Sequence, residues 1–250
     1  MKELPFISCK MITYGRVSTL EEALHSFLIQ DYPKDKCELI IVNDYPLQKL
    51  VFDHPQVTII NLDETFSLIG EKENYAIERC KGPLIAVWDD DDLAMPNHLQ
   101  NIAKYWGEDA NLLHWNRAVA YNDKKISSIM AVGNSGIVYS KEAWREIGKS
   151  PLMNAGGDMV LVRALEALGK DKVVRAFPSD AEVSWFYYWA HRSYHQSGLG
   201  TDDDTRPNIV IRNSAHIELE RSKGNIPTGI INLNPHWDLN YQQQLKDFVK

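Results

Sequence analysis

The sequence lacks any apolar run that approaches the roughly 20 residues of a membrane-spanning helix. Its first residues also lack the apolar stretch that is typical of a secretory leader. We therefore expect a cytoplasmic protein with no membrane span.

Cysteine is scarce. Cys9, Cys37 and Cys80 are odd in number, lie in apolar segments and lack the spacing of metal ligands, so we expect reduced core residues. No repeat, low-complexity tract or Gly/Ser-rich linker divides the 250 residues. The sequence therefore predicts one domain over residues 1–250, with a core over about 6–195 and a C-terminal extension or lid over about 196–250.

A surplus of positive charge is also absent. The formal net charge is −7, which disfavours a broad nucleic-acid-binding surface, although a local basic groove is compatible with it. We expect nucleic acid to be an improbable partner.

Short β-rich runs alternate with amphipathic segments through the first half of the chain. The sequence predicts strands at 6–12, 38–42, 57–61, 84–88, 111–121 and 127–132, and helices at 18–30, 71–80, 95–106, 141–147, 159–168 and 239–249. Ser18 and Glu21 have the spacing of a capping box for the first helix. The alternation predicts an α/β fold with a mostly parallel central sheet and helices on both faces.

Four consecutive aspartates, Asp89, Asp90, Asp91 and Asp92, follow the apolar run 83–88. A buried strand that ends in acid places carboxylates at the carboxyl edge of a sheet, where open α/β folds bind ligands. Adjacent carboxylates repel each other, and Mg²⁺ or Mn²⁺ relieves the repulsion while leaving positions for phosphate oxygens. The run favours a divalent-metal site over the alternative, a solvated acidic turn before the next helix.

Polar residues also follow two other predicted strands. Thr13 and Tyr14 follow the first, and Asn43 and Asp44 follow the second. A tyrosine ring can lie against a base, Asp44 can accept hydrogen bonds from a base or ribose, and a metal can hold a pyrophosphate. Together these features fit a nucleotide diphosphate. Taken singly, Thr13 and Tyr14 also fit a turn, and Asp44 fits a plain Asx turn.

The order of the motifs extends beyond these strand ends. Residues 13–16 (Thr-Tyr-Gly-Arg) are followed by 26–33 (Ser-Phe-Leu-Ile-Gln-Asp-Tyr-Pro) and by the strand that ends at Asn43 and Asp44. Residues 70–77 (Gly-Glu-Lys-Glu-Asn-Tyr-Ala-Ile) then precede the strand into the aspartates. The ordered set resembles the family 2 glycosyltransferases of the GT-A fold and their approach to the D-x-D motif, over about residues 6–195.

The resemblance implies a role for each matching position. Residues implied to surround the nucleoside, usually uridine in this family, or the phosphates are Thr13, Tyr14, Arg16, Asp44, Lys72 and Asn74. Asp89 or Asp90 is implied to contact the ribose, and Asp91, with Asp89, to ligate the metal. Two departures weaken these assignments, because Asn43 replaces an aspartate of many members and Glu73 replaces an arginine that often precedes the asparagine.

Residues 154–159 (Asn-Ala-Gly-Gly-Asp-Met) open a predicted helix and resemble the family's Glu-Asp acceptor motif, with Gly157 in place of the glutamate. Glycosyl transfer with inversion needs a carboxylate that takes the acceptor's hydroxyl proton. We predict that Asp158 is this catalytic base. The alternative is that Asp158 only caps the helix.

An aromatic stretch, 185–195, carries two histidines. The resemblance implies that His191, or in reserve His195, reaches the metal or diphosphate, although a packed core histidine is an equal alternative. Trp185, Tyr188 and Trp189 fit sugar-stacking platforms or simply core. Trp115 and the loop 133–136 lie where the resemblance places donor-sugar contacts, or make a turn.

The sequence thus predicts a metal-dependent, inverting glycosyltransferase that uses Mn²⁺ or Mg²⁺ and moves a sugar from a nucleotide diphosphate, expected to be UDP. The expected acceptor is a hydroxyl of a saccharide or glycoconjugate. One alternative is an inactive sugar-nucleotide or divalent-cation binding module. A sugar nucleotidyltransferase is disfavoured because residues 13–16 are too short and poor in glycine for its phosphate loop.

Overall fold

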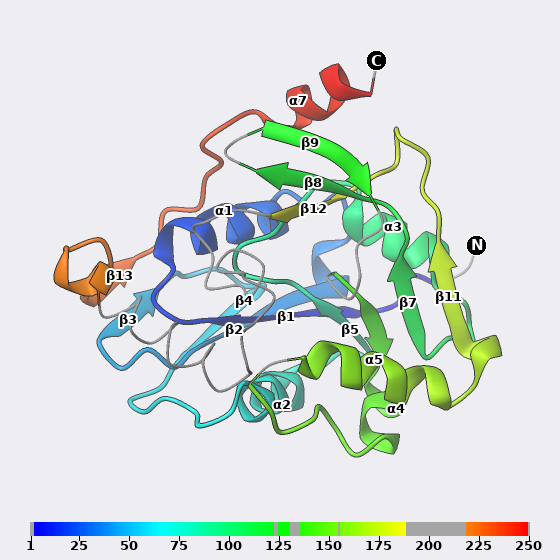
Figure 1. Ribbon diagram of the computed structural model, residues 1–250, viewed down its shortest axis with the longest axis horizontal. Coiled ribbons are helices and arrows are strands. Elements are labelled where there is room, and N and C mark those ends of the chain that lie inside the picture. Colours follow the sequence, from blue (N-terminus) through cyan, green and yellow to red (C-terminus); the bar gives the residue numbers. More distant parts are fainter. Residues whose placement is uncertain (1–2, 123–124, 131–135, 155, 189–218, 250) are drawn as a thin grey trace, which may run out of the picture.

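The computed structural model describes residues 3–122, 125–130, 136–154, 156–188 and 219–249 (Figure 1). A seven-stranded sheet has the order β11-β7-β10-β5-β1-β2-β4. Its strands are β1 (Ile7–Thr13), β2 (Cys37–Asn43), β4 (Val57–Asn61), β5 (Leu84–Val87), β7 (Leu112–Trp115), β10 (Val138–Ser140) and β11 (Val173–Ala176). Neighbours pair in parallel except around β10, which is antiparallel to β5 and β7. The predicted mostly parallel α/β sheet is confirmed.

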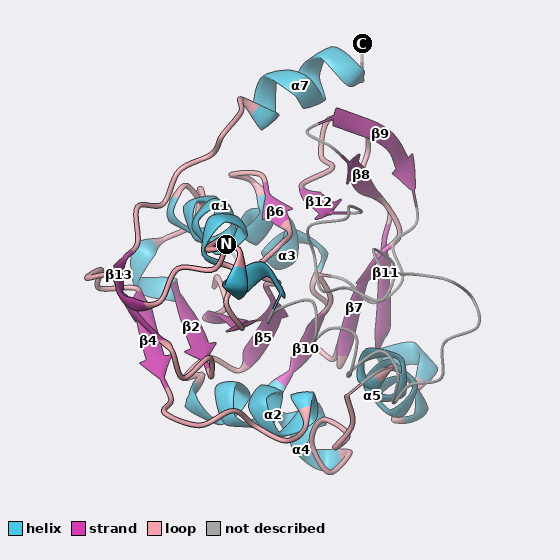
Figure 2. Cartoon of the chain, turned by 60° about the vertical axis from the view of Figure 1, so that its left-hand side comes forward, coloured by secondary structure: helices cyan, strands magenta, loops and turns pink. Residues whose placement is uncertain are grey.

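Helices cover both faces of this sheet (Figure 1, Figure 2). On one face lie α1 (Val17–Leu28) and α3 (His98–Tyr105), and on the other lie α2 (Ile69–Arg79), α4 (Lys141–Glu146) and α5 (Gly157–Ala167). Side chains alternate between the two faces along a strand. In β2, Leu39 and Ile41 pack with the core around α1, whereas Ile40 and Val42 pack with the core around α2.

Two smaller sheets flank the central one. The first has the order β6-β12-β8-β9 and contains β6 (Leu93–Ala94), β12 (Trp185–Tyr188), β8 (Ala118–Asn122) and β9 (Lys125–Met130). The C-terminal helix α7 (Tyr241–Phe248) packs against this sheet through Tyr241 and Leu245. In the second, β3 (Gln48–Val51) pairs in parallel with β13 (Gly229–Asn232). Short 3₁₀ helices cover Lys34–Lys36 and Lys170–Lys172.

Several sequence predictions were wrong in detail. The capping box at Ser18 is absent among the described residues, because α1 begins at Val17 after Arg16, and its N-cap makes no side-chain bond. The single strand predicted at 111–121 is two strands, β7 and β8, which lie in different sheets. The short strands β3, β6, β10, β11 and β13 were not predicted.

The buried aromatic residues favour the core alternative for two tryptophans. Trp185 is fully buried with its ring centroid 5.0 Å from that of His98, and Trp115 donates from Nε1 to the Gly136 carbonyl at 2.8 Å. Gly136 has φ 64°, and a Cβ there would lie 2.7 Å from the Trp185 ring. The glycine at position 136 therefore leaves room for the Trp185 indole. This packing explains the glycine without a contact between the backbone and a sugar.

The three cysteines lie in the core, as the sequence analysis expected. Cys9, Cys37 and Cys80 are buried free cysteines, and burial raises the pKa of Cys80 to about 12. Within the described parts of the chain, no helix combines the length and apolar character needed to cross a membrane.

Candidate functional site

Three loops meet at the carboxyl edge of the central sheet. Thr13, the last residue of β1, pairs in register with Asn43, the last residue of β2. Lys10 pairs with Val87 at the end of β5, which only Trp88 separates from the aspartates. The structure thus brings together the loop ends that the sequence analysis expected to converge.

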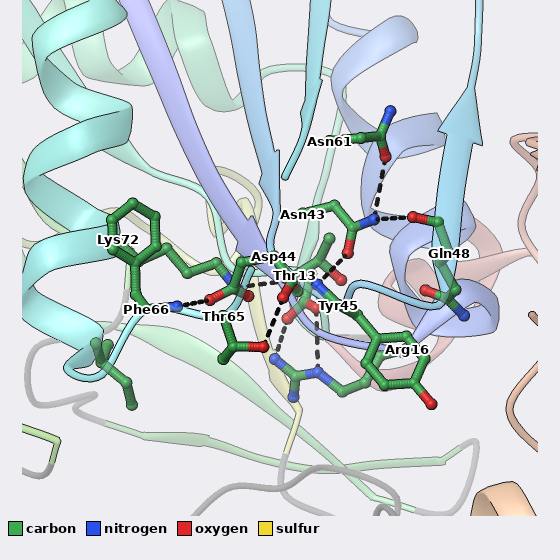
Figure 3. Close-up of polar contacts among 12 residues, drawn as sticks. Thr13, Arg16, Asn43, Asp44, Tyr45, Gln48, Asn61, Thr65, Phe66 and Lys72 are labelled. Atoms are coloured by element: carbon green, nitrogen blue, oxygen red, sulfur yellow. Dashed lines mark hydrogen bonds and ion pairs between the residues drawn. The ribbon is translucent and has the colours of Figure 1, made fainter. Parts of the chain in front are cut away.

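Asp44 is the centre of a buried polar network (Figure 3). Its Oδ1 accepts from Lys72 Nζ, and its Oδ2 accepts from the backbone N–H of Phe66 at 3.0 Å. Lys72 Nζ also donates to the Thr13 carbonyl at 2.6 Å. Burial lowers the pKa of Lys72, and the attraction of Asp44 opposes that change. The pair therefore ties α2 to the ends of β1 and β2.

Asn43, not Asp44, forms the Asx turn. Its Oδ1 accepts from the Tyr45 backbone N–H at 3.1 Å, and its Nδ2 donates to Asn61 Oδ1 at 3.0 Å and to the Gln48 carbonyl at 3.1 Å. The plain-turn alternative for Asp44 was wrong, because the preceding residue satisfies the turn. The asparagine at position 43, a departure from the family pattern, has a structural role of its own.

Arg16 bridges two of the four aspartates. Its guanidinium donates to both carboxylate oxygens of Asp90, with Nε at 3.1 Å from Oδ2, and from Nη1 to Asp91 Oδ2 at 2.8 Å. Burial alone would lower the pKa of Arg16, but the neighbouring carboxylates, Asp90 foremost, raise it. Burial also raises the pKa of Asp90, against the attraction of Arg16. Arg16 therefore holds the Asp90 and Asp91 side chains close together.

A second ion pair lies beside Asp89. Lys10, buried in the middle of β1, contacts Glu73 of α2 at 2.5 Å between Nζ and Oε1. Burial raises the pKa of Asp89 to about 7, an effect that Lys10 offsets in part and that Asp91 and Asp90 reinforce. Carboxylates therefore outnumber buried cations at this edge of the sheet.

Tyr14 lies next to the Asp44 network. Its ring meets the Tyr45 ring edge to face, with 4.8 Å between centroids. Lys72 Nζ lies 5.9 Å from the Tyr14 ring centroid. Of the predicted nucleotide residues, the structure therefore brings together Thr13, Tyr14, Arg16, Asp44, Lys72 and Asp90.

Asn74 lies in a different environment. Its Nδ2 donates to the Ser150 carbonyl at 3.0 Å, and its Oδ1 accepts from the Ser150 N–H at 2.8 Å. These bonds join α2 to the segment after α4 and do not connect Asn74 to the Asp44 network. Its nucleotide-binding role stays a prediction.

Asp158 is exposed in the first turn of α5. The N-cap of this helix is Gly156, with φ 69°, so Asp158 does not cap it. The preceding segment is docked on the start of α2, because Asn154 Oδ1 accepts from the Ile69 N–H at 3.0 Å. Gly70 permits this contact, since a Cβ there would lie 1.9 Å from the Pro151 carbonyl oxygen.

The described residues do not form a metal site by themselves, so the predicted ligands stay a prediction. His191 and His195 lie outside the described residues, and those that are described contain no group of three or more His, Cys, Asp or Glu side chains arranged to hold a metal ion. A cavity of about 90 Å³ opens beside Asp91. Its lining comes from the start of α1, the aspartate loop and the C-terminal segment: Ser18, Thr19, Glu21, Glu22, Asp91, Leu93, His236 and Asp238.

Sequence reasoning missed two kinds of site residue. Lys10 carried a usable signal, because a charged side chain within an apolar strand needs a buried partner. The C-terminal segment carried no signal in the sequence that it would lie here. In the structure Ile226 packs on Tyr45, and Glu22 accepts hydrogen bonds from the Asp238 N–H and the Tyr241 hydroxyl. Contacts between residues about 200 positions apart cannot be inferred from local pattern.

Comparisons with known proteins follow this geometry. The model of the family described as "Glycosyl transferase family 2" matches residues 8–169. Among curated proteins, the chain is 28 % identical over 141 residues to "Uncharacterized glycosyltransferase YwdF" of Bacillus subtilis (strain 168). The aligned region covers 54 % of this chain and 51 % of that relative, so the chain spans only part of the relative's length.

Solved structures share the fold at low sequence identity. TarS 1–349 of S. aureus, in complex with UDP-GlcNAc, has a TM-score of 0.60 at 14 % identity, over 97 % of this chain and 71 % of that chain. The mannosyltransferase PcManGT of Pyrobaculum calidifontis, in complex with GDP-Man and Mn²⁺, has a TM-score of 0.58 at 16 % identity, over 90 % and 73 %. These likenesses confirm the GT-A architecture that the sequence predicted.

Proposed function

Because the chain belongs to glycosyl transferase family 2, we propose that it transfers a sugar from a nucleotide diphosphate to an acceptor hydroxyl. The observation that carries the proposal is the meeting of two buried charge networks at adjacent strand ends. Lys72 joins Asp44 to the Thr13 carbonyl, and Arg16 joins Asp90 to Asp91. The carboxyl ends of parallel strands, where these preorganised polar side chains meet, are where α/β folds bind nucleotides.

The proposed donor is a UDP-sugar. Tyr14 provides a ring that can lie against the base, and Asp44 keeps carboxylate lone pairs that can accept from the base or ribose. Thr13 ends β1 directly before Tyr14, and its carbonyl accepts from the same Lys72 Nζ that donates to Asp44. UDP-GlcNAc in the TarS complex supports a uridine donor, whereas GDP-Man in the PcManGT complex shows that another base occurs on this fold.

The proposal includes a divalent cation, Mn²⁺ or Mg²⁺, held by Asp91 and Asp89. Magnesium in proteins is commonly held by one or two carboxylates together with substrate phosphates and waters, so a set of three protein ligands is not required. Burial raises the pKa of Asp89 to about 7, and the neighbouring Asp91 and Asp90 carboxylates raise it further. A cation would relieve the repulsion among these carboxylates, so the residues present fit the ion. When bound, the ion would neutralise the leaving diphosphate. His191 stays a proposed further ligand.

Asp158 is the proposed catalytic base. In a single displacement with inversion, its carboxylate would take the proton of the acceptor hydroxyl as that oxygen attacks the anomeric carbon. Asp158 is exposed in the first turn of α5, a position that an acceptor, here proposed to be a saccharide or glycoconjugate, can approach from solvent. Nucleic acid is disfavoured as acceptor by the net charge of −7. A cytoplasmic location stays a prediction.

Calorimetric titration of UDP into the purified protein tests the donor site. With Mn²⁺ we expect saturable binding that EDTA weakens at least tenfold, an estimate for the loss of one ion-bridged diphosphate contact. GDP and ADP serve as controls for the base. If neither UDP nor another nucleotide binds, the proposal is refuted.

A second experiment separates an enzyme from a binding module. Asp158→Asn should abolish transfer while the Kd for UDP stays unchanged, because the base acts on the acceptor. Asp171→Asn, also an exposed aspartate at the start of a short helix, is the matched control. Donor binding with no transfer or donor hydrolysis by the wild type, across a panel of UDP-sugars and acceptors, would favour the binding module.

A further inference from the structure

Residues 226–232 lie beside the candidate nucleotide site although they are remote from it in sequence. β13 pairs in parallel with β3, which follows the Asp44 loop (Figure 1). Gln48 Nε2 donates to the Pro227 carbonyl at 2.6 Å, and the Gly229 N–H donates to the Leu47 carbonyl at 2.7 Å. The C-terminal segment is thus fixed to the loop after β2.

Ile226 packs against this loop. It is 6 % exposed and forms a small buried cluster with Tyr45, against which Tyr14 packs. A Cβ on Gly15 would lie 3.4 Å from Ile226 Cγ2 and 3.9 Å from Tyr45 Cδ1. Ile226 therefore contacts the loop that carries Tyr14 as well as the ring that packs on it.

The orientation of Tyr14 depends on this cluster. Its ring lies at 67° to the Tyr45 ring, an edge-to-face arrangement that specifies ring direction. A tyrosine on a loop without such a neighbour would sample other rotamers, and a ligand that needs one rotamer would have to order it at a cost in affinity. Packing by Ile226 keeps Tyr45 buried and so keeps the Tyr14 rotamer fixed.

We propose that Ile226 is a positioning residue for nucleoside binding: acting through Tyr45, it holds the Tyr14 ring in the orientation that lies against the base. The inference rests on the proposed nucleotide-binding function. It assigns a role to a segment beyond residues 8–169, the part that the family model matches. The C-terminal part of the chain then completes the donor site.

The first test is Ile226→Ala, with UDP titrated calorimetrically in the presence of Mn²⁺. Loss of an ordered stacking partner should raise the Kd about five- to tenfold, within the range measured for base–aromatic stacking. Ile226→Val retains most of the contact with Tyr45, so its Kd should be close to that of the wild type. The matched control is Ile230→Ala, since Ile230 is 70 % exposed on β13 and should leave the Kd unchanged.

A double-mutant cycle distinguishes positioning from general loosening of the fold. If Ile226 acts through Tyr14, Ile226→Ala should have no further effect on the Kd once Tyr14→Ala is present. Thermal unfolding of each variant checks that it is folded at the titration temperature. Additive losses, or an unchanged Kd in either single alanine variant, would overturn the proposal.

The proposed function and the proposed role of Ile226 are refuted by different results. If the wild type binds no nucleotide, the proposed function itself fails. If the wild type binds UDP and Ile226→Ala binds it equally well, the donor site stands and only the role of Ile226 is refuted.

Discussion

Replacing Lys72 with methionine tests how strongly the Asp44–Lys72 pair stabilises the fold. Methionine preserves most of the apolar length of the side chain but removes the ammonium group, which bonds to Asp44 and to the Thr13 carbonyl. The two side chains are 7 % and 3 % exposed. In Lys72→Met the Asp44 carboxylate would therefore stay buried without its cation.

The expected loss follows from these contacts. Removing one partner of a buried ion pair costs about 3–5 kcal/mol of unfolding free energy. Asp44 would keep its hydrogen bond from the Phe66 N–H at 3.0 Å, which places the loss near the lower end, about 3 kcal/mol. In a chain of this size that loss lowers the Tm by about 6–12 °C.

Thermal unfolding followed by circular dichroism at pH 7 measures the effect in Lys72→Met, Asp44→Asn and the double variant. The double variant should lose less than the sum of the single losses, because neither charge is left buried alone. Lys49→Met, at an exposed position in β3, is the control and should leave the Tm nearly unchanged. A Tm decrease under about 2 °C for Lys72→Met, or additive losses in the double variant, would refute the reasoning.

Three further variants test other contacts. Arg16→Gln removes the cation that pairs with Asp90 and Asp91, so in EDTA it should lower the Tm. Added Mn²⁺ should then raise the Tm of the variant more than that of the wild type. Equal Tm shifts with Mn²⁺ would argue against competition between Arg16 and the ion for these carboxylates. Gly70→Ala should lower the Tm strongly, because its Cβ would lie 1.9 Å from the Pro151 carbonyl oxygen, whereas Gly107→Ala, with its nearest atoms at 3.6 Å, should have little effect. Burial lowers the pKa of His98 to about 3. Below about pH 6.5 the His98 imidazole binds a proton in the unfolded chain but not in the folded chain. The free energy of unfolding is therefore unaffected above that pH and decreases as the pH falls, by about 2 kcal/mol at pH 5. Urea unfolding at pH 5 and 8 should show this decrease in the wild type and a smaller one in His98→Gln.

The central strands were predictable because burial on both faces gives them continuous apolar runs. β4 matches its predicted range, β1 and β2 differ from theirs by one residue at each end, and β5 differs by one residue at its C-terminal end. In contrast, β3, β10 and β13 have four residues or fewer, and such runs carry too little periodicity to distinguish a strand from a turn. The boundary between β7 and β8 was missed because the chain changes sheets at Asn116 without a glycine or proline.

The candidate site was predictable where one strand end carried several polar residues. Thr13, Asp44 and the aspartates met as expected because β1, β2 and β5 are neighbours in the sheet. The partner of each charge was not predictable, because Arg16 and Asp90 are separated by 74 positions and Lys10 and Glu73 by 63. Pairings of this kind are set by tertiary packing rather than by local sequence.

The departure at Glu73 has a physical explanation in these pairings. Lys10 of β1 neutralises Glu73, so this exchange of an arginine for a glutamate leaves a compensated pair rather than an unpaired buried carboxylate. Lys72 and Arg16 are likewise engaged with carboxylates. All three cations are already paired with carboxylates, so little net positive charge is left here to attract a diphosphate, which the aspartates beside them repel. A further positive charge would therefore strengthen binding of a nucleotide diphosphate at this edge, and this is the electrostatic reason for including a divalent cation in the proposed function.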